Sequence, residues 1–310
     1  MTFRVTALAS LLLVAASACA TNTEPSTTAA AESDTYTGID GVVASIADTS
    51  RIVSLNGDLT ETIFALGAGE QVVGIDLTTT FPEAATSLPD VGLGRNLQAE
   101  AVIALSPTLV LGDTQVGPDS AIEQIRAAGI PVVILQSEVT LDGVARKISA
   151  VGEILGLEQA AIDLASEVDL AIDEGLALAA TATSTPRVAY VYVRGPETVL
   201  LFGNGMPTHF LIEAAHAIDA AGEVEVVFAE DLNAETLVTA SPDVIVTPTA
   251  GFDIIGGLDA FRALPGIADT PAGRSGRIVT IDEALLLGMG PRVGQALADL
   301  VRELHPELGE

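Results

Sequence analysis

The chain is poor in the residues that mark several classes of protein. Its 310 residues include no tryptophan and one cysteine, and aromatic residues make up 4% of the total. The single cysteine, Cys19, cannot form a disulfide within the chain. No apolar run beyond the N-terminus is long enough to cross a bilayer. The motifs of common hydrolases, zinc peptidases and phosphate-binding loops are missing as well, so an enzyme is not expected.

Positive charge is also scarce. Forty-two acidic residues against 13 basic ones give a net charge of −29. Such a surface repels phosphate backbones, which argues against nucleic acid as a partner. The same charge fits a soluble, self-repelling surface. Because Lys147 is the only lysine, any anionic ligand must be bound by a few well-placed arginines.

The first 19 residues have the pattern of a lipoprotein signal peptide. Arg4 precedes a short apolar core at residues 5–16, and small residues stand directly before Cys19. A cleaved leader with an incidental cysteine would look the same. If Cys19 is lipidated with two or more chains, it anchors the protein stably to the outer face of the cell membrane, which is then the only membrane contact.

Residues 20–48 are rich in threonine, alanine, serine and acidic residues. They show no periodic apolar pattern, so a disordered tether is predicted for this range. It would hold the folded part at some distance from the membrane.

Short apolar runs alternate with helical patterns in the rest of the chain, which predicts parallel sheets covered by helices. The predicted strands are 51–55, 71–76, 107–112, 131–136, 187–194, 243–247 and 277–282. The predicted helices are 59–66, 99–105, 120–128, 208–217, 234–240 and 292–304. Residues 141–182 are rich in alanine, leucine and glutamate and predict a long helix, which Gly156 can interrupt. The expected fold is therefore α/β: an N-terminal lobe (49–140), a connecting helix (141–182) and a similar C-terminal lobe (183–310).

One segment occurs twice, once in each predicted lobe. LQAEAVIALSPTLVLG at 97–112 returns as LNAETLVTASPDVIVT at 232–247. Glu100 and Glu235 hold the same place in both copies, near the start of a helix. A carboxylate there stabilises the helix dipole by about 0.3–1 kcal/mol, which alone is a reason to keep it.

The strand at 187–194 carries a row of polar side chains on one face. Alternate residues of a strand share a face, so Tyr190, Tyr192 and Arg194 project together. Tyr192 and Arg194 lie toward the carboxyl end of the strand, where open α/β sheets usually bind ligands. An arginine at the end of an apolar strand needs an anion or another acceptor.

These segments resemble a known family. The leader, RIVSLNGDLTETIFALG (51–67) and the first repeat copy are similar to helix-linked periplasmic-binding proteins, the class III or cluster A receptors of ABC importers. Within that class AYVYVRG (189–195), GGLDAFRALPGIADTPAG (256–273) and LLLGMGPRVGQALADL (285–300) resemble the haemin-binding HmuT-like group. The resemblance implies two lobes that hold a ligand between them and dock on a permease dimer with its ATPase.

The resemblance also implies roles for particular residues. Glu100 and Glu235 correspond to docking acids, one for each permease subunit. Tyr192 corresponds to the axial iron ligand of haem, with Arg194 as its partner. A phenolate oxygen is a hard donor that suits ferric iron.

The loop at 91–97 departs from both haemin-binding patterns of the family. Leu93 stands where one group has tyrosine, and Arg95 stands where the other has histidine. We expect Arg95 to bind a propionate or another anionic group, or else to face solvent. His209 follows a glycine-rich loop and is a candidate second iron ligand.

The expected function is that of an extracytoplasmic, lipid-anchored receptor that delivers haem to an ABC permease. A ferric siderophore or cobalamin is the alternative ligand. A surface lipoprotein that stores or relays haem without a permease is the alternative of a different class.

Overall fold

The computed structural model describes residue 2 and residues 34–309. The predicted signal peptide and Cys19 lie outside the described residues. The tether predicted for residues 20–48 is wrong at its C-terminal end, because strands β1 (Asp34–Thr37) and β2 (Val43–Ile46) form an antiparallel hairpin. The buried positions Ala44 and Ile46 alternate with exposed ones along β2, a period of two that the composition of the segment had obscured.

The N-terminal lobe is built on a four-stranded parallel sheet with the order β4-β3-β5-β6. Its strands are β3 (Ile52–Ser54), β4 (Val72–Ile75), β5 (Leu109–Asp113) and β6 (Val132–Leu135). The strands are almost entirely buried, as expected for a parallel sheet covered on both faces. The helices of this lobe are α1 (Gly57–Ala65), α2 (Glu83–Thr86), α3 (Ala99–Ala104) and α4 (Asp119–Ala127).

The C-terminal lobe has a mixed sheet rather than the expected parallel one. Its order is β10-β8-β7-β11-β12, with β9 paired to the start of β7. β7, β11 and β12 are parallel, whereas β8 runs antiparallel to β7 and β10 antiparallel to β8. The bounds are β7 (Arg187–Val193), β8 (Val199–Phe202), β9 (Ile218–Asp219), β10 (Ala229–Asp231), β11 (Val244–Pro248) and β12 (Ile278–Ile281).

Seven helices belong to the described part of the C-terminal lobe. They are α7 (Pro207–Ala214), α8 (Ala234–Ala240), α9 (Thr249–Ile255), α10 (Leu258–Arg262), α11 (Pro271–Ser275), α12 (Glu283–Leu287) and α13 (Val293–Leu304). Short 3-10 turns lie at 69–71, 94–96, 222–224, 267–269 and 306–308.

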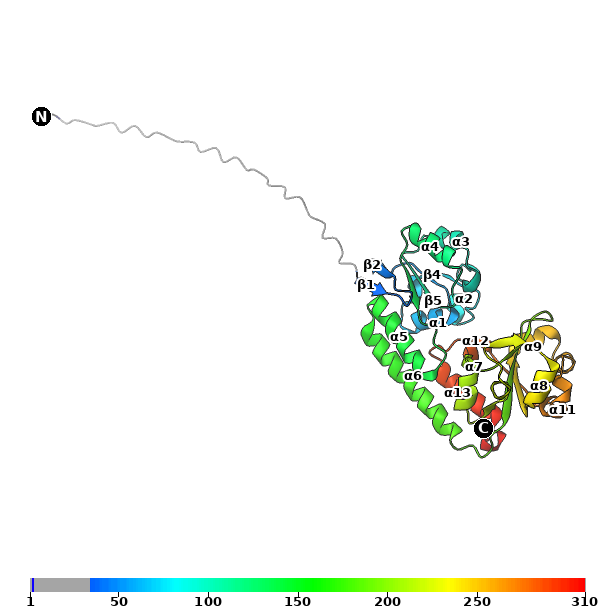
Figure 1. Cartoon of the computed structure of the whole chain (residues 1–310). Helices are drawn as coiled ribbons and strands as arrows, with labels where there is room; N and C mark the ends of the chain where they lie inside the picture. The colour runs from blue at the N-terminus through cyan, green and yellow to red at the C-terminus, as the bar shows by residue number, and fades with distance from the viewer. Residues whose placement is uncertain (1, 3–33, 310) are drawn as a thin grey trace. The chain divides into compact units, whose positions relative to one another are not determined.

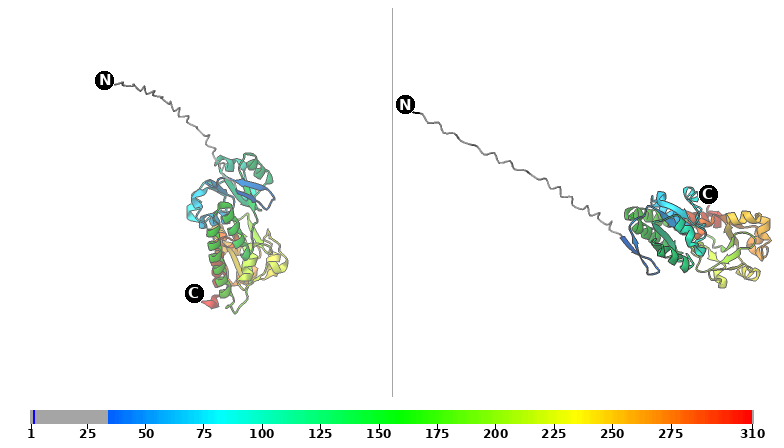
Figure 2. Two further views of the ribbon diagram at one scale, coloured as in Figure 1. Left: turned by 90° about the vertical axis from the view of Figure 1, so that its left-hand side faces the viewer. Right: turned by 90° about the horizontal axis from the view of Figure 1, so that it is seen from above.

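Two helices lie in the segment that connects the lobes. α5 (Leu141–Leu155) ends at Gly156, which has φ +67°, and the chain then turns into α6 (Glu158–Ala179). Both helices lie along one side of the two lobes (Figures 1 and 2). The predicted connecting helix is α6, whose 22 residues span about 33 Å. The break at Gly156 follows from the left-handed conformation, which glycine adopts without a steric penalty.

The described residues form three apolar cores. One belongs to the N-terminal lobe alone and one to the C-terminal lobe alone. The third is continuous across both lobes, because it contains residues of α1, α5, α6, α7 and α13. In this core α13 packs closely on α6, because any side chain at Gly294 of α13 would collide with Ala171 of α6. Over the described part of the chain, no helix combines the length and the apolar character needed to span a membrane.

Candidate functional site

The duplicated segment folds in the same way in both lobes. Each copy forms a short helix, α3 or α8, then a serine in the left-handed region, then a buried strand, β5 or β11. Ser106 has φ +48° and Ser241 has φ +50°. Glu100 and Glu235 lie exposed in the first turn of their helices. The sequence repeat is therefore a structural repeat that presents one free carboxylate on each lobe.

An arginine at the start of the first strand supports this helix in each lobe. Arg51 donates from Nη2 to Leu105 O at 2.5 Å and from Nε to Ser106 O at 3.0 Å. Arg187 donates from Nε and Nη2 to Ala240 O at 3.1 and 2.8 Å. Both arginines thus bind carbonyls at the C-terminal end of the repeat helix, where a cation is favourable.

The tyrosines of β7 have different surroundings. Tyr190 is 1% exposed, and its hydroxyl has no hydrogen-bond partner among the described residues. Tyr192 is half-buried and stacks on Phe202 of β8, with ring centroids 5.3 Å apart and an angle of 15° between the rings. Arg194 follows on the same face and is exposed. Tyr192 is therefore packed through its ring and partly exposed.

Charged residues of both lobes change the pKa of Tyr192. Burial raises the pKa of Tyr192, and the Glu283 carboxylate raises this pKa further by its charge and by hydrogen bonding. The guanidinium groups of Arg194 and Arg95 act in the opposite direction. Arg95 belongs to the N-terminal lobe, so charges from both lobes act on the pKa of Tyr192.

Glu283 was not predicted from the sequence. It stands at the start of α12, two residues after β12 ends at Ile281. Its position nevertheless indicates a place near the ligand site. Asp282 and Glu283 directly follow an apolar strand, and the carboxyl ends of parallel strands meet at one edge of a sheet. In so acidic a chain nothing in the sequence separated this carboxylate from the others.

The loop that carries Arg95 is fixed against the N-terminal sheet. Leu77 N donates to Gly92 O at 3.0 Å, and Gly117 N donates to Gly94 O at 3.0 Å. Gly94 N points to Oδ2 of Asp76 at 3.4 Å. A side chain at Gly94 would lie 2.6 Å from a backbone oxygen, so the close approach requires glycine. Arg95 itself stays exposed at the end of this anchored loop.

The structure does not bring His209 to Tyr192. His209 Nδ1 lies 2.9 Å from Asp219 Oδ2, and its Nε2 lies 3.5 Å from Glu213. Asp219 pairs with Val188 at the beginning of β7, four residues before Tyr192. His209 therefore sits toward the opposite end of the strand, with both ring nitrogens directed at carboxylates.

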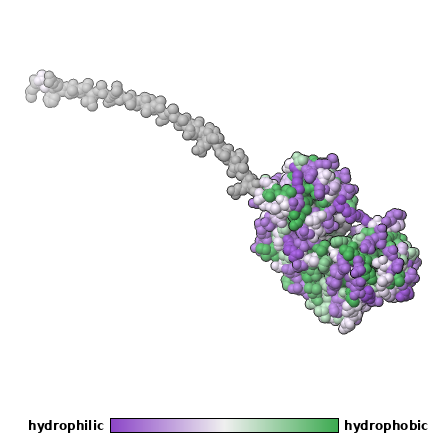
Figure 3. All heavy atoms as spheres, in the orientation of Figure 1, coloured by the Kyte–Doolittle hydropathy of each residue, from purple (hydrophilic) through white to green (hydrophobic). Residues whose placement is uncertain are grey.

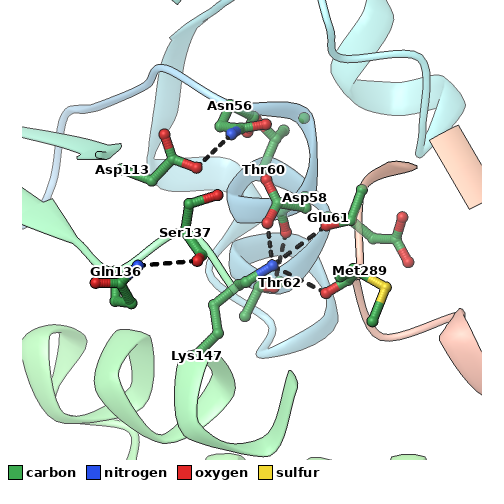
Figure 4. Close-up of polar contacts among 12 residues, drawn as sticks. Asn56, Asp58, Thr60, Glu61, Thr62, Asp113, Gln136, Ser137, Lys147 and Met289 are labelled. Atoms are coloured by element: carbon green, nitrogen blue, oxygen red, sulfur yellow. Dashed lines mark hydrogen bonds and ion pairs between the residues drawn. The ribbon is translucent and has the colours of Figure 1, made fainter. Parts of the chain in front are cut away.

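A buried ion pair joins the two lobes. Lys147 Nζ of α5 binds Asp58 of α1 and donates to the carbonyls of Gly288 at 3.2 Å and Met289 at 2.9 Å (Figure 4). The side chains of Lys147 and Asp58 are 2% and 6% exposed. One ammonium group thus connects the N-terminal lobe, the connecting segment and the C-terminal lobe. The charge is costly to bury but is compensated by three acceptors.

A second contact between the lobes involves Arg292, directly before α13. It donates to the Glu61 carboxylate from Nε at 3.0 Å and from Nη2 at 2.8 Å, and its backbone N donates to the same carboxylate at 3.1 Å. Its guanidinium carbon lies 3.6 Å from the centroid of the Phe81 ring. Glu61 and Phe81 both belong to the N-terminal lobe.

The surface also contains a cavity of about 310 Å³ between the β1–β2 hairpin, β6 and α5. Tyr36, Ile39 and Arg146 lie in its wall, and Lys147 lines it as well. None of Tyr192, Arg194 and Arg95 lines it. Hydrophobic residues form scattered patches among hydrophilic ones on the face of both lobes shown in Figure 3.

Comparison with solved structures identifies the fold. The periplasmic haem-binding protein RhuT of Roseiflexus sp. RS-1 is 42% identical, with a TM-score of 0.81 over 84% of this chain and 100% of that chain. The haem-binding protein HmuT is 30% identical, with a TM-score of 0.84 over 88% of this chain and 90% of that chain. The expected class, two α/β lobes with a helical connection, is confirmed.

Sequence comparison leads to the same family. The cobalamin-binding protein of Halobacterium salinarum is 27% identical over 267 residues, which are 83% of this chain and 70% of that protein. YvrC of Bacillus subtilis, an uncharacterized ABC transporter substrate-binding lipoprotein, is 26% identical over 263 residues, 84% of this chain and 81% of that protein. A family model described as periplasmic binding protein matches residues 52–285. The chain belongs to the periplasmic binding protein family and is the extracytoplasmic, non-enzymatic substrate-binding component of an ABC transporter.

Proposed function

We propose that the protein binds haem between its lobes, with Tyr192 as the iron ligand, and delivers it to the permease. The main support is that Tyr192 and Arg194 lie on one face at the carboxyl end of β7, where the charges of Arg194 and Arg95 both favour the phenolate of Tyr192. A hard oxygen donor suits ferric iron, and guanidinium groups suit carboxylates such as the two propionates of haem. RhuT and HmuT, both named as haem-binding proteins, share this fold at 42% and 30% identity.

The phenol of Tyr192 must lose its proton to bind iron. Burial and Glu283 raise its pKa, so the free receptor carries a neutral phenol at neutral pH. Binding of ferric haem then releases one proton, and affinity rises with pH. Arg194 and Arg95 favour the phenolate and reduce the cost of this step.

Tyr192 is then the one iron ligand that the protein supplies. His209, the earlier candidate for a second ligand, is omitted because its nitrogens face Asp219 and Glu213. Leu93 and Arg95 offer no ligand in the loop where related groups have one.

Cobalamin is the second candidate, because a cobalamin-binding protein is 27% identical over 83% of this chain and a vitamin B12-binding protein is 32% identical over 35% of it. Cobalamin arrives with its own axial ligands, so it makes no use of a tyrosine flanked by two arginines. The two ligands are distinguished by the effect of Tyr192 on binding.

We propose further that Glu100 and Glu235 dock on the two subunits of the permease. Each is exposed at the same position of a repeated element, as a partner with two equivalent surfaces would require.

We also propose that Cys19 carries the lipid anchor. The lipoprotein pattern of the leader supports this assignment, as does the lipoprotein relative in Bacillus subtilis.

The absorption spectrum after addition of ferric haem tests the ligand. The wild type should give a Soret band and the charge-transfer band of tyrosinate-bound iron. Tyr192→Phe removes only the oxygen and should weaken binding at least about ten-fold, because charge-assisted and metal contacts are lost together. Tyr190→Phe is the matched control in the same strand and should bind as the wild type does. An unchanged spectrum in Tyr192→Phe contradicts the proposal, and binding of cobalamin alone would favour the second candidate.

A further inference from the structure

The histidine of α7 that does not reach Tyr192 is held by a buried carboxylate. His209 Nδ1 lies 2.9 Å from Oδ2 of Asp219, whose side chain is 3% exposed. Oδ1 of Asp219 accepts a hydrogen bond from the backbone N of Ala221 at 3.1 Å, which fixes the carboxylate in place. Since a carboxylate can only accept, Nδ1 is the nitrogen that carries the proton of the neutral imidazole. The lone pair of His209 is therefore at Nε2.

Nε2 faces a second carboxylate at a distance that is too long for a good hydrogen bond. It lies 3.5 Å from Oε2 of Glu213, one turn further along α7. A charge-assisted N–H···O bond measures about 2.7–2.9 Å. Two ligand atoms of one tetrahedral zinc ion, each about 2.1 Å from the metal, are about 3.4 Å apart. Nε2 and the Glu213 carboxylate therefore have the spacing of two ligands of one metal ion.

The pair is open to solvent on the side away from Asp219. The side chain of His209 is 16% exposed and that of Glu213 is 59% exposed, so an ion can reach Nε2 from the surface. A histidine that binds a metal almost always donates its other ring N–H to a carboxylate, a carbonyl or water, which orients the ring. Asp219 supplies this contact from the buried side.

We propose that His209 and Glu213 bind a divalent transition-metal ion of the zinc type, with Asp219 as the positioning residue for the histidine. Imidazole nitrogen suits zinc, copper and nickel, whereas calcium and magnesium take oxygen ligands. Over the described residues, no group of three histidine, cysteine or acidic side chains could hold a metal ion, so water completes the coordination of this one. The net charge of −29 attracts cations to the surface.

This metal site is separate from the proposed haem site. Asp219 pairs with Val188 at the beginning of β7, and Tyr192 lies four residues further along that strand. The metal site therefore does not depend on the proposed function, and each can fail without the other.

Titration of the purified, metal-free protein with zinc, followed by calorimetry in the absence of haem, tests the site. The wild type should bind one zinc ion, and His209→Ala should abolish this binding. Asp219→Asn leaves both ligands in place and should weaken binding about 10–100-fold. Glu213→Gln removes a ligand and should weaken binding at least about ten-fold. Because Glu213 is exposed, this variant tests the site even if His209→Ala does not fold.

His216→Ala is the matched control, because His216 is an exposed histidine of the same lobe whose Nε2 faces the Thr185 hydroxyl at 3.4 Å. It should bind zinc as the wild type does. Zinc should also raise the Tm of the wild type more than that of Glu213→Gln, since an ion that binds the folded state stabilises it.

Three results would overturn the metal site. The first is a wild type that binds no zinc, in which case His209 is an imidazolium held between two carboxylates. The second is equal affinity of Glu213→Gln and the wild type. The third is unchanged binding by His209→Ala, which would show that zinc binds only adventitiously to the acidic surface.

Discussion

At the scale of single residues, the buried carboxylate of Asp76 contacts the loop that carries Arg95. Its Oδ1 accepts hydrogen bonds from the backbone N of Thr78 at 3.2 Å and from the Thr78 hydroxyl at 2.7 Å. Its Oδ2 faces Gly94 N at 3.4 Å. Burial nevertheless raises the pKa of Asp76 to about 6, because the hydrogen bonds only partly compensate the loss of water.

This shift predicts a pH dependence of stability. A carboxyl group whose pKa is raised in the folded state contributes full stability below its unfolded pKa, and that contribution is lost as pH rises through the folded value, here about 6. Asp76→Asn does not titrate. The free energy of unfolding of this variant, relative to the wild type, should therefore be more favourable at about pH 7.5 than at about pH 4. Urea denaturation at both pH values measures the difference, and an equal difference at both would contradict the shift.

Sequence alone located part of the candidate site. Strand alternation placed Tyr192 and Arg194 on one face, and the departure from the family pattern drew attention to Arg95. His209 was misplaced because a glycine-rich loop before a helix does not say which end of the sheet it reaches. The contact between Phe81 and Arg292 could not be predicted, because the two residues lie on different lobes and such contacts have no local signal.

At the scale of elements, the turn between α5 and α6 decides the direction of the connecting helix. Gly156 ends α5 with φ +67° and ψ +33°, and its backbone N donates to Glu153 O. No atom lies within 4 Å of the position that a side chain would take. The need for glycine therefore comes from the backbone conformation and not from crowding.

Gly156→Ala should lower the free energy of unfolding by about 1–2 kcal/mol, the usual cost of a left-handed conformation for a residue with a side chain. Gly156→Asn should cost less, because asparagine adopts this conformation more readily. Chemical denaturation of the three proteins gives the comparison. An alanine variant as stable as the wild type would show that α5 and α6 can turn in another way.

The parallel strands β3–β7, β11 and β12 were predicted, and the antiparallel strands β8 and β10 of the C-terminal lobe were not. β3, β5 and β11 are buried throughout and consist mainly of valine, leucine and isoleucine. β10 is exposed throughout and reads Ala-Glu-Asp, with no apolar pattern. It becomes a strand because it pairs with β8, and that pairing between distant residues is invisible to a local pattern.

At the scale of the whole molecule, the duplication explains the arrangement of the two lobes. The equivalent positions of Ser106 and Ser241, and of Arg51 and Arg187, show that both lobes repeat one strand–helix–strand unit. The repeat was evident in the sequence. The two arginines were not, because each acts on a helix more than 50 residues away along the chain.

Reversing the charge of both repeated acids should separate transport from binding. The double variant Glu100→Arg, Glu235→Arg should lose import while haem affinity is unchanged, because repulsion replaces attraction at both docking surfaces. Each single variant should reduce import in part. Uptake by cells that carry each variant, together with haem titration of the purified proteins, provides the test. The corresponding change at Glu123, an exposed acid outside the repeat, is the control. Normal import by the double variant would rule out docking through these residues.

The buried position of Lys147 gives the folded protein an unusual chemical property. No other residue has an ε-amine, and this one is enclosed by Asp58 and two backbone carbonyls. Amine-acylating reagents therefore reach this lysine only when the contact between the lobes opens. A lysine-specific protease needs α5 to unfold around Lys147 as well. The rate at which Lys147 is acylated consequently reports how firmly the two lobes are held together.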